Sequence, residues 1–434
     1  MNRRRNVLVF PCGSEIGLEL HRALAYSTHF QAIGASSVDD HGRFAYDQYQ
    51  GGLPFVGPDL LAPLTTLLRQ HEIDLLVPAH DSAVLLFAEW AAAGRLGDTR
   101  LVGSPLETCR IARSKVATYD WLGSVVAVPA RHAPDEPPLR FPVFLKPDVG
   151  QGSRGTHLAH DEAELRFHLD RDPSLLFCEH LPGPEFTIDC FTDRHGNLRF
   201  VGARERRRVA GGISVHSIEA EDPRFGEIAE AIHSSLTFRG QWFFQLKERV
   251  DGELVLLEIA PRCSGASGFY RIRGVNLPLL SLHDALDRDV SVQANPCRLE
   301  MDRALASRHR LDFAFDEVYV DLDDALLWDG GVNHRLVAVL YRFRNEGKRL
   351  HLLTRHGDRH ADSAIEALEA KALSPSLFDT IVEVGESEPK AERITSGEAI
   401  FIDDSFAERH AVLKAKGIPV FDINQAIEIF GDFH

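Results

Sequence analysis

Residues 6–105 alternate short apolar runs with amphipathic segments, and this alternation restricts the possible folds more than any other feature of the chain. Apolar runs such as NVLVFP, FQAIGAS and IDLLVPAHD have the length of strands, whereas EIGLELHRAL and DLLAPLTTLLRQH have helical spacing. Short buried strands joined by helices favour a parallel sheet with crossover helices. We therefore predict an α/β domain over residues 1–110.

Two short motifs follow strands of this predicted domain. The segment PCGSEIG spaces its glycines as GxxxG rather than GxGxxG, so a tight turn is favoured over a dinucleotide site. Asp81 ends the run VPAHD and has two interpretations. Its carboxylate could enter a crevice at the carboxyl end of the sheet, or it could cap the next helix.

Charge and composition argue against several classes of partner. A formal net charge of -16 disfavours a general nucleic-acid or anionic-membrane surface, because phosphodiesters are bound by cationic groups. The six cysteines are scattered without a CxxC pair, which is typical of a reduced cytoplasmic protein. The apolar run at 7–10 is too short for a signal peptide, and no later run approaches the roughly 20 apolar residues that cross a bilayer. We expect a cytoplasmic protein that binds neither nucleic acid nor membranes.

A glycine-rich loop follows the predicted strand FPVFLKP. Gly152, Ser153 and Gly155 belong to the loop GQGSRG, whose bare backbone amides can fold around phosphate oxygens. Lys146 adds a cation on the preceding strand. Taken alone, the loop supports a phosphate site and a plain surface turn equally.

An arginine run, RERRR, lies on a later predicted strand. Side chains alternate along a strand, so Arg204, Arg206 and Arg208 are expected on one face. Three guanidinium groups facing a cleft would suit an anionic substrate, whereas the alternative is a solvated strand edge. Because the whole protein is acidic, we favour the cleft.

The stretch WFFQLKERVDGELVLLEIAPR predicts an antiparallel hairpin with its turn at Asp251 and Gly252. Its first strand carries Gln245, and its second carries Glu258, with Arg262 just beyond. Oxygen ligands beside a cation are the groups that hold a metal ion and a polyphosphate. The hairpin is therefore a candidate metal and phosphate site.

The chain carries five motifs in order, FLKP, GQGSRG, CEHLPGPEFTID, RERRRVAGGIS and LLEIAPRCSG. Together they resemble the ATP-grasp superfamily, and within it the carbamoyl-phosphate-synthase-like ligases, over residues 1 to about 300. The resemblance implies a pre-ATP-grasp α/β domain at 1–110, an ATP-grasp α+β domain at 111–300, and ATP and Mg²⁺ as cofactors. Lys146 would contact the nucleotide phosphates. Lys115 matches a cation near the start of the grasp, although for Lys115 alone a solvated side chain is the simpler account.

The same resemblance implies further roles. Glu179 begins the hinge that contacts adenine through its backbone, and Glu185 matches the acidic group that holds the ribose hydroxyls. Gln245 and Glu258 match metal ligands between the triphosphate oxygens, and Arg262 would stabilise charge on the transferred phosphoryl group. The glycine loop would cover the phosphates.

One position departs from the family. The strand that usually ends Glu-Ile-Asn-Pro-Arg here has Ala260 in place of the asparagine. A water molecule would replace the lost oxygen, because magnesium commonly keeps several waters. An alternative is therefore a nucleotide sensor that binds ATP without ligase activity.

After a connector at 301–314, strand and helix patterns alternate again over residues 315–434. Polar residues follow the predicted strands, as expected at the carboxyl end of a parallel sheet. These residues are Asp321, Asp323 and Asp324 in DLDD, Thr354 in LLTRHG, Lys390 in SEPKAERI, and Asp403 and Asp404 in FIDDS. A helix-capping cluster or a calcium-like loop is the alternative for DLDD.

This second set resembles the haloacid-dehalogenase (HAD) phosphatases. Asp321 would be the nucleophile and Asp323 the general acid and base, with Thr354 and Lys390 holding the phosphate. Asp403 with Asp404 near it, together with Asp321 and Asp323, would form the Mg²⁺ site. The spacings leave no room for a cap domain, which implies a capless, Rossmann-like HAD domain.

The combined prediction is a two-enzyme fusion in three α/β and α+β domains. An ATP-dependent carboxylate–amine ligase would act through an acyl phosphate, and a phosphohydrolase would act on the same pathway. The expected partners are a small carboxylate, an amine and a phosphorylated compound, and a homodimer is the assembly considered. The alternatives are a phosphatase regulated by a degenerate ATP-binding domain, or a ligase with a non-catalytic HAD-like module.

Overall fold

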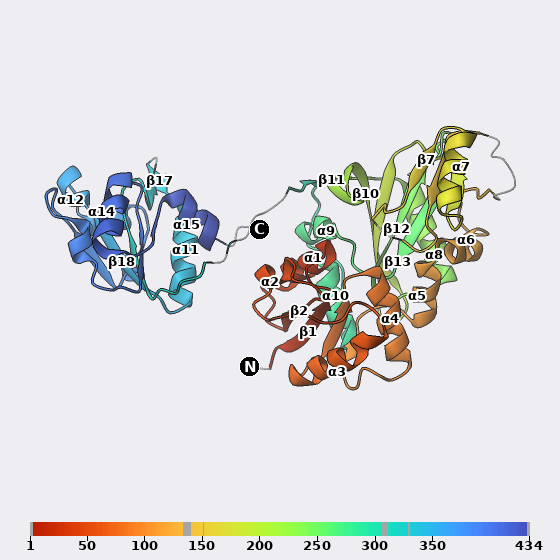
Figure 1. The fold of residues 1–434 in the computed structure, drawn as a ribbon, viewed down its shortest axis with the longest axis horizontal. Helices are drawn as coiled ribbons and strands as arrows, with labels where there is room; N and C mark the ends of the chain where they lie inside the picture. Colours follow the sequence, from red (N-terminus) through yellow and green to blue (C-terminus); the bar gives the residue numbers. More distant parts are fainter. Residues whose placement is uncertain are drawn as a thin grey trace. The chain divides into compact units, whose positions relative to one another are not determined.

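The computed structural model describes residues 3–132, 140–150, 152–304, 309, 311–328 and 330–431. The chain folds into two compact units, Met1–Leu305 and Ala306–His434 (Figure 1). Each unit has its own sheets and apolar cores.

The first unit begins with a parallel sheet in the order β3-β2-β1-β4-β5. Its elements are β1 Arg5–Phe10, α1 Glu15–Leu24, β2 Phe30–Ala35, α2 Gly42–Ala45, β3 Tyr49–Gln50, η1 Pro58–Leu60, α3 Leu61–Gln70, β4 Leu75–Pro78, α4 Asp81–Ala92 and β5 Arg100–Leu101. Leu8 and Phe10 of β1 pack into one apolar cluster, whereas Val7 and Val9 pack into another. Both faces of the sheet are therefore buried, as in parallel sheets covered by helices. The predicted α/β organisation of this segment is confirmed.

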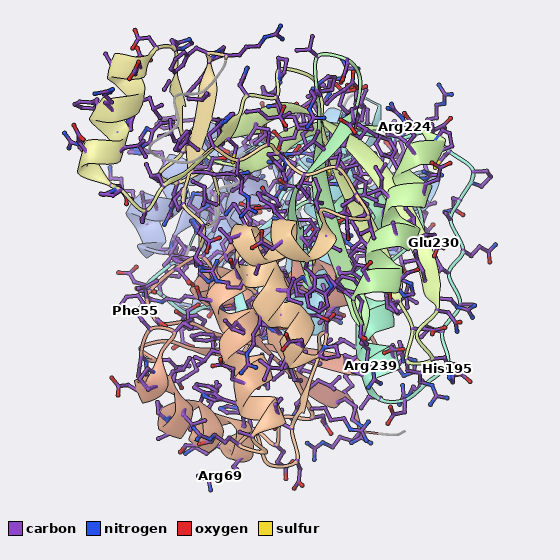
Figure 2. The ribbon with its side chains drawn as sticks, turned by 90° about the vertical axis from the view of Figure 1, so that its right-hand side faces the viewer. Phe55, Arg69, His195, Arg224, Glu230 and Arg239 are labelled. Carbon is purple, nitrogen blue, oxygen red and sulfur yellow. The ribbon has the colours of Figure 1, made fainter. Side chains whose placement is uncertain are left out.

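A second, antiparallel sheet has the order β13-β12-β9-β10-β11-β14. Its elements and the helices next to them are β9 Glu185–Thr192, β10 Leu198–Ala210, β11 Ile213–Glu219, α8 Pro223–Ser235, β12 Gly240–Glu248, β13 Leu254–Ala260, α9 Gly268–Ile272, α10 Leu277–Ala285 and β14 Glu300–Asp302. Helix α8 packs Phe225 against the sheet core around Trp242 and Phe244. Arg224 and Glu230 of α8 are exposed (Figure 2).

A small antiparallel sheet, β7-β6-β8, completes the first unit. Its elements and the helices before and within it are α5 Leu106–Arg113, α6 Lys115–Leu122, β6 Val143–Lys146, β7 His157–Ala159, α7 Glu162–Arg171 and β8 Leu176–Glu179. Its core, with Val143, Leu145 and Phe177 among its members, is separate from that of the large sheet. Two sheets with separate cores can therefore face one another across a cleft.

The second unit is a parallel sheet in the order β19-β18-β15-β20-β21. Its elements are β15 Glu317–Val320, β16 Leu327–Trp328, β17 Gly331–Val332, α11 His334–Asn345, β18 Arg349–Thr354, α12 His356–Arg359, α13 Ala364–Ala370, η2 Pro375–Leu377, β19 Thr380–Glu383, η3 Lys390–Arg393, β20 Ala399–Ile402, α14 Phe406–Lys416, β21 Val420–Phe421 and α15 Ile423–Phe430. Val318 and Val320 of β15 enter one core, and Tyr319 enters the other. The predicted parallel α/β pattern is confirmed here as well.

The expected connector at 301–314 begins too early. Strand β14 occupies 300–302 and pairs with β11 of the large sheet, His216 with Asp302 and Ile218 with Glu300. The first two connector residues thus belong to the first unit, because they complete the edge of its sheet. None of the helices in the described parts of the chain is long and apolar enough to span a membrane.

Candidate functional sites

A cleft in the first unit is lined from both the small and the large sheet. Phe144, Leu158, Cys178, Leu181 and Leu257 give one part of it an apolar lining. Most of the residues predicted for nucleotide and metal also line it, together with Arg206, which was predicted to face a substrate: Lys115, Lys146, Gly152, Ser153, Glu179, Glu185, Gln245 and Glu258. An apolar slot beside convergent charged groups is the usual composition of a small-molecule site.

Lys146 is fixed deep in this cleft. Only 5% of the residue is exposed, and its Nζ donates a hydrogen bond to the Tyr119 hydroxyl at 2.6 Å. Tyr119 in turn donates to the carbonyl of Leu257 at 2.7 Å. Burial lowers the pKa of Lys146. An anionic phosphate beside Lys146 would offset this cost, because an opposite charge favours the ammonium form.

Lys115 lies at the start of α6 rather than on a strand, and it lines the cleft. Its Nζ donates to the carbonyl of Asp148 at 3.2 Å, next to the glycine loop. Lys115 is therefore partly buried at the cleft rather than on a fully solvated face. Sequence separation concealed this contact, since a loop 33 residues later supplies the partner.

The two acidic residues predicted for the hinge and the ribose, Glu179 and Glu185, face cations. Glu179 accepts from Arg249 Nε at 3.0 Å and from the backbone N–H of Ala130 at 2.9 Å. Glu185 lies 3.2 Å from Arg206 Nη1 and 3.7 Å from Lys247 Nζ. The sequence analysis did not single out Lys247 as a partner of Glu185. Lys247 follows Gln245 by two residues on one strand, a spacing that places both side chains on the same face.

The glycine loop approaches the turn between β10 and β11. Gly152, Ser153 and Gly155 all have positive φ, and Gly155 lies outside the residues that line the cleft. A Cβ on Gly212 would lie 2.4 Å from the backbone carbon of Gly152. The close approach requires glycine at 212, because real Cβ atoms never come this close to backbone.

The predicted metal ligands face each other across the hairpin. Gln245 on β12 is registered opposite Glu258 on β13. Burial raises the pKa of Glu258, and the Asp81 charge adds to the rise, while Lys115 and two arginines oppose it. A divalent cation would favour the ionised form of this buried carboxylate. Ala260, at the end of the same strand, is buried and offers no side-chain oxygen.

The arginine run divides into buried and exposed members. Arg204 is buried and donates to Asp189 at 3.0 Å and to Ser264 at 3.2 Å. Arg206 is also nearly buried and donates to the Gly212 carbonyl at 2.8 Å. Both line a second cavity beside the first cleft.

Arg208 does not join them, so the prediction that all three face one cleft is wrong. Its side chain is 58% exposed and pairs with Asp302 of β14. The register between β10 and β11 shifts on both sides of Arg208. Such an irregularity breaks strict alternation and turns the side chain toward the strand edge.

Arg262 and Asp81 connect the hairpin to the parallel sheet. Arg262 donates from Nε and Nη2 to the two carboxylate oxygens of Asp81 at 2.7 and 2.8 Å. Burial alone would raise the pKa of Asp81, but Arg262 outweighs burial and lowers it. His80 rather than Asp81 caps α4, and Asp81 lines the second cavity, as the crevice interpretation expects.

The second cavity shares residues with the first cleft. Gln245, Glu258, Gly152, Arg154 and Arg206 line both. The other walls of the second cavity include the 14–16 segment at the start of α1, the start of α4, the turn between β10 and β11, and the 264–266 segment. Two compartments thus meet at the predicted metal ligands, which is the arrangement a transfer reaction between two bound molecules requires.

In the second unit, the predicted residues converge at the carboxyl ends of β15, β18 and β20. Lys390 Nζ lies 3.0 Å from Asp321 and 2.7 Å from Asp403. Thr354 is fully buried, and Asp404 lies at the exposed side of a carboxylate cluster with Asp321 and Asp403. This cluster joins residues that are up to 83 positions apart in the sequence, Asp321 and Asp404.

The carboxylates of this cluster have altered acidities. Burial raises the pKa of Asp403 to about 7, and the Asp321 charge adds to the rise. Burial also raises the pKa of Asp321, against the opposing effects of Lys390, the Leu322 N–H and Thr354. Burial alone would lower the pKa of Lys390, but the two aspartates outweigh it and raise it. One lysine cannot balance the negative charge of several carboxylates. A divalent cation bound by these oxygen atoms would neutralise the charge that remains.

Asp323 lies apart from this cluster. Its Oδ1 lies 2.8 Å from His356 Nδ1. Between Asp321 and Thr354, the described residues form only the β16–β17 hairpin, helix α11 and strand β18. The sequence analysis did not single out His356, although the spacing of His356 and His360 on one helical turn could have indicated it.

Comparisons with known proteins concern the first unit. Residues 171–305 match the family model described as "ATP-grasp in the biosynthetic pathway with Ter operon". The carbamoyl phosphate synthase large chain of Clostridium botulinum (strain Alaska E43 / Type E3) is 30% identical over 141 residues. That match covers 29% of this chain and 13% of the relative's length.

Two solved structures resemble a larger part of the chain. The biotin carboxylase domain of the Hydrogenobacter thermophilus 2-oxoglutarate carboxylase, solved with MgADP and bicarbonate, superposes with a TM-score of 0.55 at 15% identity. That likeness covers 68% of this chain and 72% of the domain. The first unit has the ATP-grasp fold. The L-amino acid ligase of Bacillus licheniformis resembles this ATP-grasp unit with a TM-score of 0.52 at 19% identity, over 66% of this chain and 75% of the ligase.

Proposed function

We propose that the ATP-grasp unit is an ATP- and Mg²⁺-dependent carboxylate–amine ligase that works through an acyl phosphate. The observation that carries this proposal is the pair of adjoining compartments that share Gln245 and Glu258. The MgADP bound to the Hydrogenobacter domain and the name of the Bacillus ligase add support.

The chain's own residues would act by positioning and by charge. Lys146 and Lys115 would hold the phosphates, and the apolar part of the cleft would hold adenine. Gln245 and Glu258 would hold Mg²⁺, which offsets phosphate charge when bound.

The reaction would proceed in two balanced steps. A carboxylate oxygen of the acid attacks the γ-phosphorus, forming an acyl phosphate and releasing ADP. The amine nitrogen then attacks the acyl carbon, loses a proton, and expels inorganic phosphate. Arg262, held in place by Asp81, would stabilise the charge on the transferred phosphoryl group.

The test is release of ADP and phosphate with mixtures of amino acids and small carboxylates. Glu258→Gln should reduce turnover at least about a hundredfold, because it removes a charged metal ligand. Glu230→Gln, on the exposed side of α8, is the matched control and should leave turnover unchanged. Tight ADP binding without turnover in any mixture would instead favour a nucleotide sensor, an outcome to which Ala260 lends weight. Ala260→Asn would then be expected to restore turnover.

For the second unit we propose a Mg²⁺-dependent phosphohydrolase of the HAD type. The contacts of Lys390 with Asp321 and Asp403 carry this proposal. Asp321 would attack the phosphorus while Asp323 gives a proton to the leaving oxygen. Asp323 would then take a proton from the water that releases phosphate from Asp321.

Hydrolysis of p-nitrophenyl phosphate tests the second unit. Asp321→Asn should abolish it, whereas Asp324→Asn, on an exposed neighbouring carboxylate, should not. Equal rates in Asp321→Asn and the unaltered protein would favour a non-catalytic binding module.

A further inference from the structure

Asp323 stands at the centre of a small histidine cluster. His356 Nδ1 lies 2.8 Å and His360 Nε2 lies 3.7 Å from the same carboxylate oxygen, Asp323 Oδ1. One ligand atom from each of the three residues lies within 4.8 Å of the other two. Two ligand atoms on a tetrahedral zinc ion are roughly 3.3 to 3.5 Å apart, so small side-chain rotations suffice to enclose an ion.

A second observation concerns the far side of the His356 ring. Its Nε2 lies 3.3 Å from a carboxylate oxygen of Asp362. A histidine that ligates a metal through one ring nitrogen almost always donates its other N–H to a carboxylate, a carbonyl or water. If Nε2 carries the proton toward Asp362, the Nδ1 lone pair faces Asp323. A proton, or a metal ion in its place, then links these two atoms, which lie 2.8 Å apart.

The cluster is also open enough for an ion to enter. His356 is 5% exposed, whereas the side chain of His360 is 48% exposed. The two rings are stacked, with centroids 4.4 Å apart, and both belong to the turn around α12. His360 would therefore be the outer ligand and His356 the fixed inner one.

Ligand chemistry separates this cluster from its neighbour. Asp321, Asp403 and Asp404 offer only oxygen atoms, which suit Mg²⁺. The cluster of Asp323, His356 and His360 offers two imidazole nitrogens and one carboxylate, which suit zinc, cobalt, nickel or iron.

We propose that Asp323, His356 and His360 form a transition-metal site, with Asp362 orienting His356. An ion such as Zn²⁺ on this site engages the carboxylate that the proposed phosphohydrolase needs for proton transfer. Zinc therefore inhibits the hydrolase by occupying Asp323. Only the inhibition rests on the proposed function, since ion binding needs no catalysis.

The test is titration of the full-length protein, loaded with Mg²⁺, with Co²⁺ and Zn²⁺. Visible absorption of bound Co²⁺ and calorimetry of Zn²⁺ give the stoichiometry and the Kd. We expect one ion at this site, with intense d–d bands, and a Kd that rises at least about tenfold in His360→Ala and His356→Gln. Asp362→Asn should weaken binding about tenfold, the usual effect of losing a carboxylate that orients a ligand histidine.

Two control variants address adventitious binding by the 21 histidines of the chain. His334→Ala removes another exposed histidine of the same unit, and Asp404→Asn alters the oxygen cluster. Both should keep the Kd within about twofold. Equal affinity in His360→Ala and the unaltered protein, or no binding tighter than about 100 µM, would overturn the site. His360 is half exposed, so its variant is expected to remain folded, and thermal melting verifies this.

An assay of phosphate-ester hydrolysis distinguishes the metal site from its proposed inhibitory role. Zinc inhibition of p-nitrophenyl phosphate hydrolysis that disappears in His360→Ala supports the inhibitory role. A protein that binds Co²⁺ as expected but hydrolyses no phosphate ester supports the metal site and counts against the hydrolase alone. Binding without inhibition in an active hydrolase would overturn the inhibitory role.

Discussion

Replacing Lys390 with methionine tests the charge balance of the second unit. The substitution keeps an apolar stem of similar length but removes the only cation that the described structure places between Asp321 and Asp403. Those side chains are 10% and 0% exposed, so water cannot take over the role of the ammonium group.

The magnitude follows from these distances. At an effective dielectric constant of about 20, a charge pair near 3 Å interacts with roughly 5 kcal/mol before desolvation is counted. Removing one partner of a buried pair costs about 3–5 kcal/mol overall, because a buried charge is left uncompensated. We expect a loss of this size in the free energy of unfolding at pH 8 without Mg²⁺.

The loss should depend on pH. The pKa of Asp403 is already raised to about 7, so its protonated form favours the folded state below that pH, and this contribution is lost as pH rises through 7. Without Lys390 the pKa of Asp403 rises further. The variant can therefore relieve its repulsion by binding protons at pH 5, where the loss should shrink to about 1 kcal/mol.

Hydrogen exchange of the β15 and β20 amides measures the stability of this unit within the whole chain. Lys414→Met, on the exposed side of α14, is the control and should change stability by less than about 0.5 kcal/mol. Millimolar Mg²⁺ should restore part of the loss, by about 2.7 kcal/mol at a hundred times its Kd. The reasoning is refuted if Lys390→Met and Lys414→Met are equally stable at pH 8 without Mg²⁺.

Three further predictions concern the first unit. Asp81→Asn should lower the free energy of unfolding by about 3 kcal/mol and remove most of the ligase turnover, because Arg262 loses its charged partner. Chemical denaturation measures the first effect and ADP release the second. Gly212→Ala should weaken ADP binding about tenfold, because its added Cβ clashes with Gly152. The control Gly226→Ala, whose added Cβ has no atom within 4 Å, should leave the Kd for ADP unchanged, and calorimetry measures both values. Hydrogen bonds and Arg199 hold the pKa of Asp193 low despite burial, so Asp193→Asn should lower Tm at pH 6 by several degrees, and the difference should shrink as pH falls below about 4.

The sequence was sufficient where a rule of local geometry applied. Alternation of strands and helices predicted both parallel sheets, and the Asp251–Gly252 turn predicted the hairpin that sets Gln245 opposite Glu258. The convergence of Asp321, Lys390 and Asp403 followed from one property of parallel sheets, that their carboxyl ends share an edge.

Local rules failed where contacts join distant segments or break a periodicity. The Asp81–Arg262 pair spans 181 positions, and nothing in either segment predicts its partner. Arg208 leaves the cleft because of a register shift, which depends on how two strands twist together. His356 lies beside Asp323 because α12 begins just after β18 ends, a boundary that sequence patterns locate poorly.

The short strand β14 determines where the chain can be divided. A shortened protein ending at residue 297 would leave the outer edge of β11 without partners for Ser217 and its neighbours, and would leave Arg208 without Asp302. Unpaired edges of this kind recruit other chains and promote aggregation. Expression of the ATP-grasp unit alone should therefore extend through residue 304, and a protease that cuts after that point should release it with its sheet edge still closed.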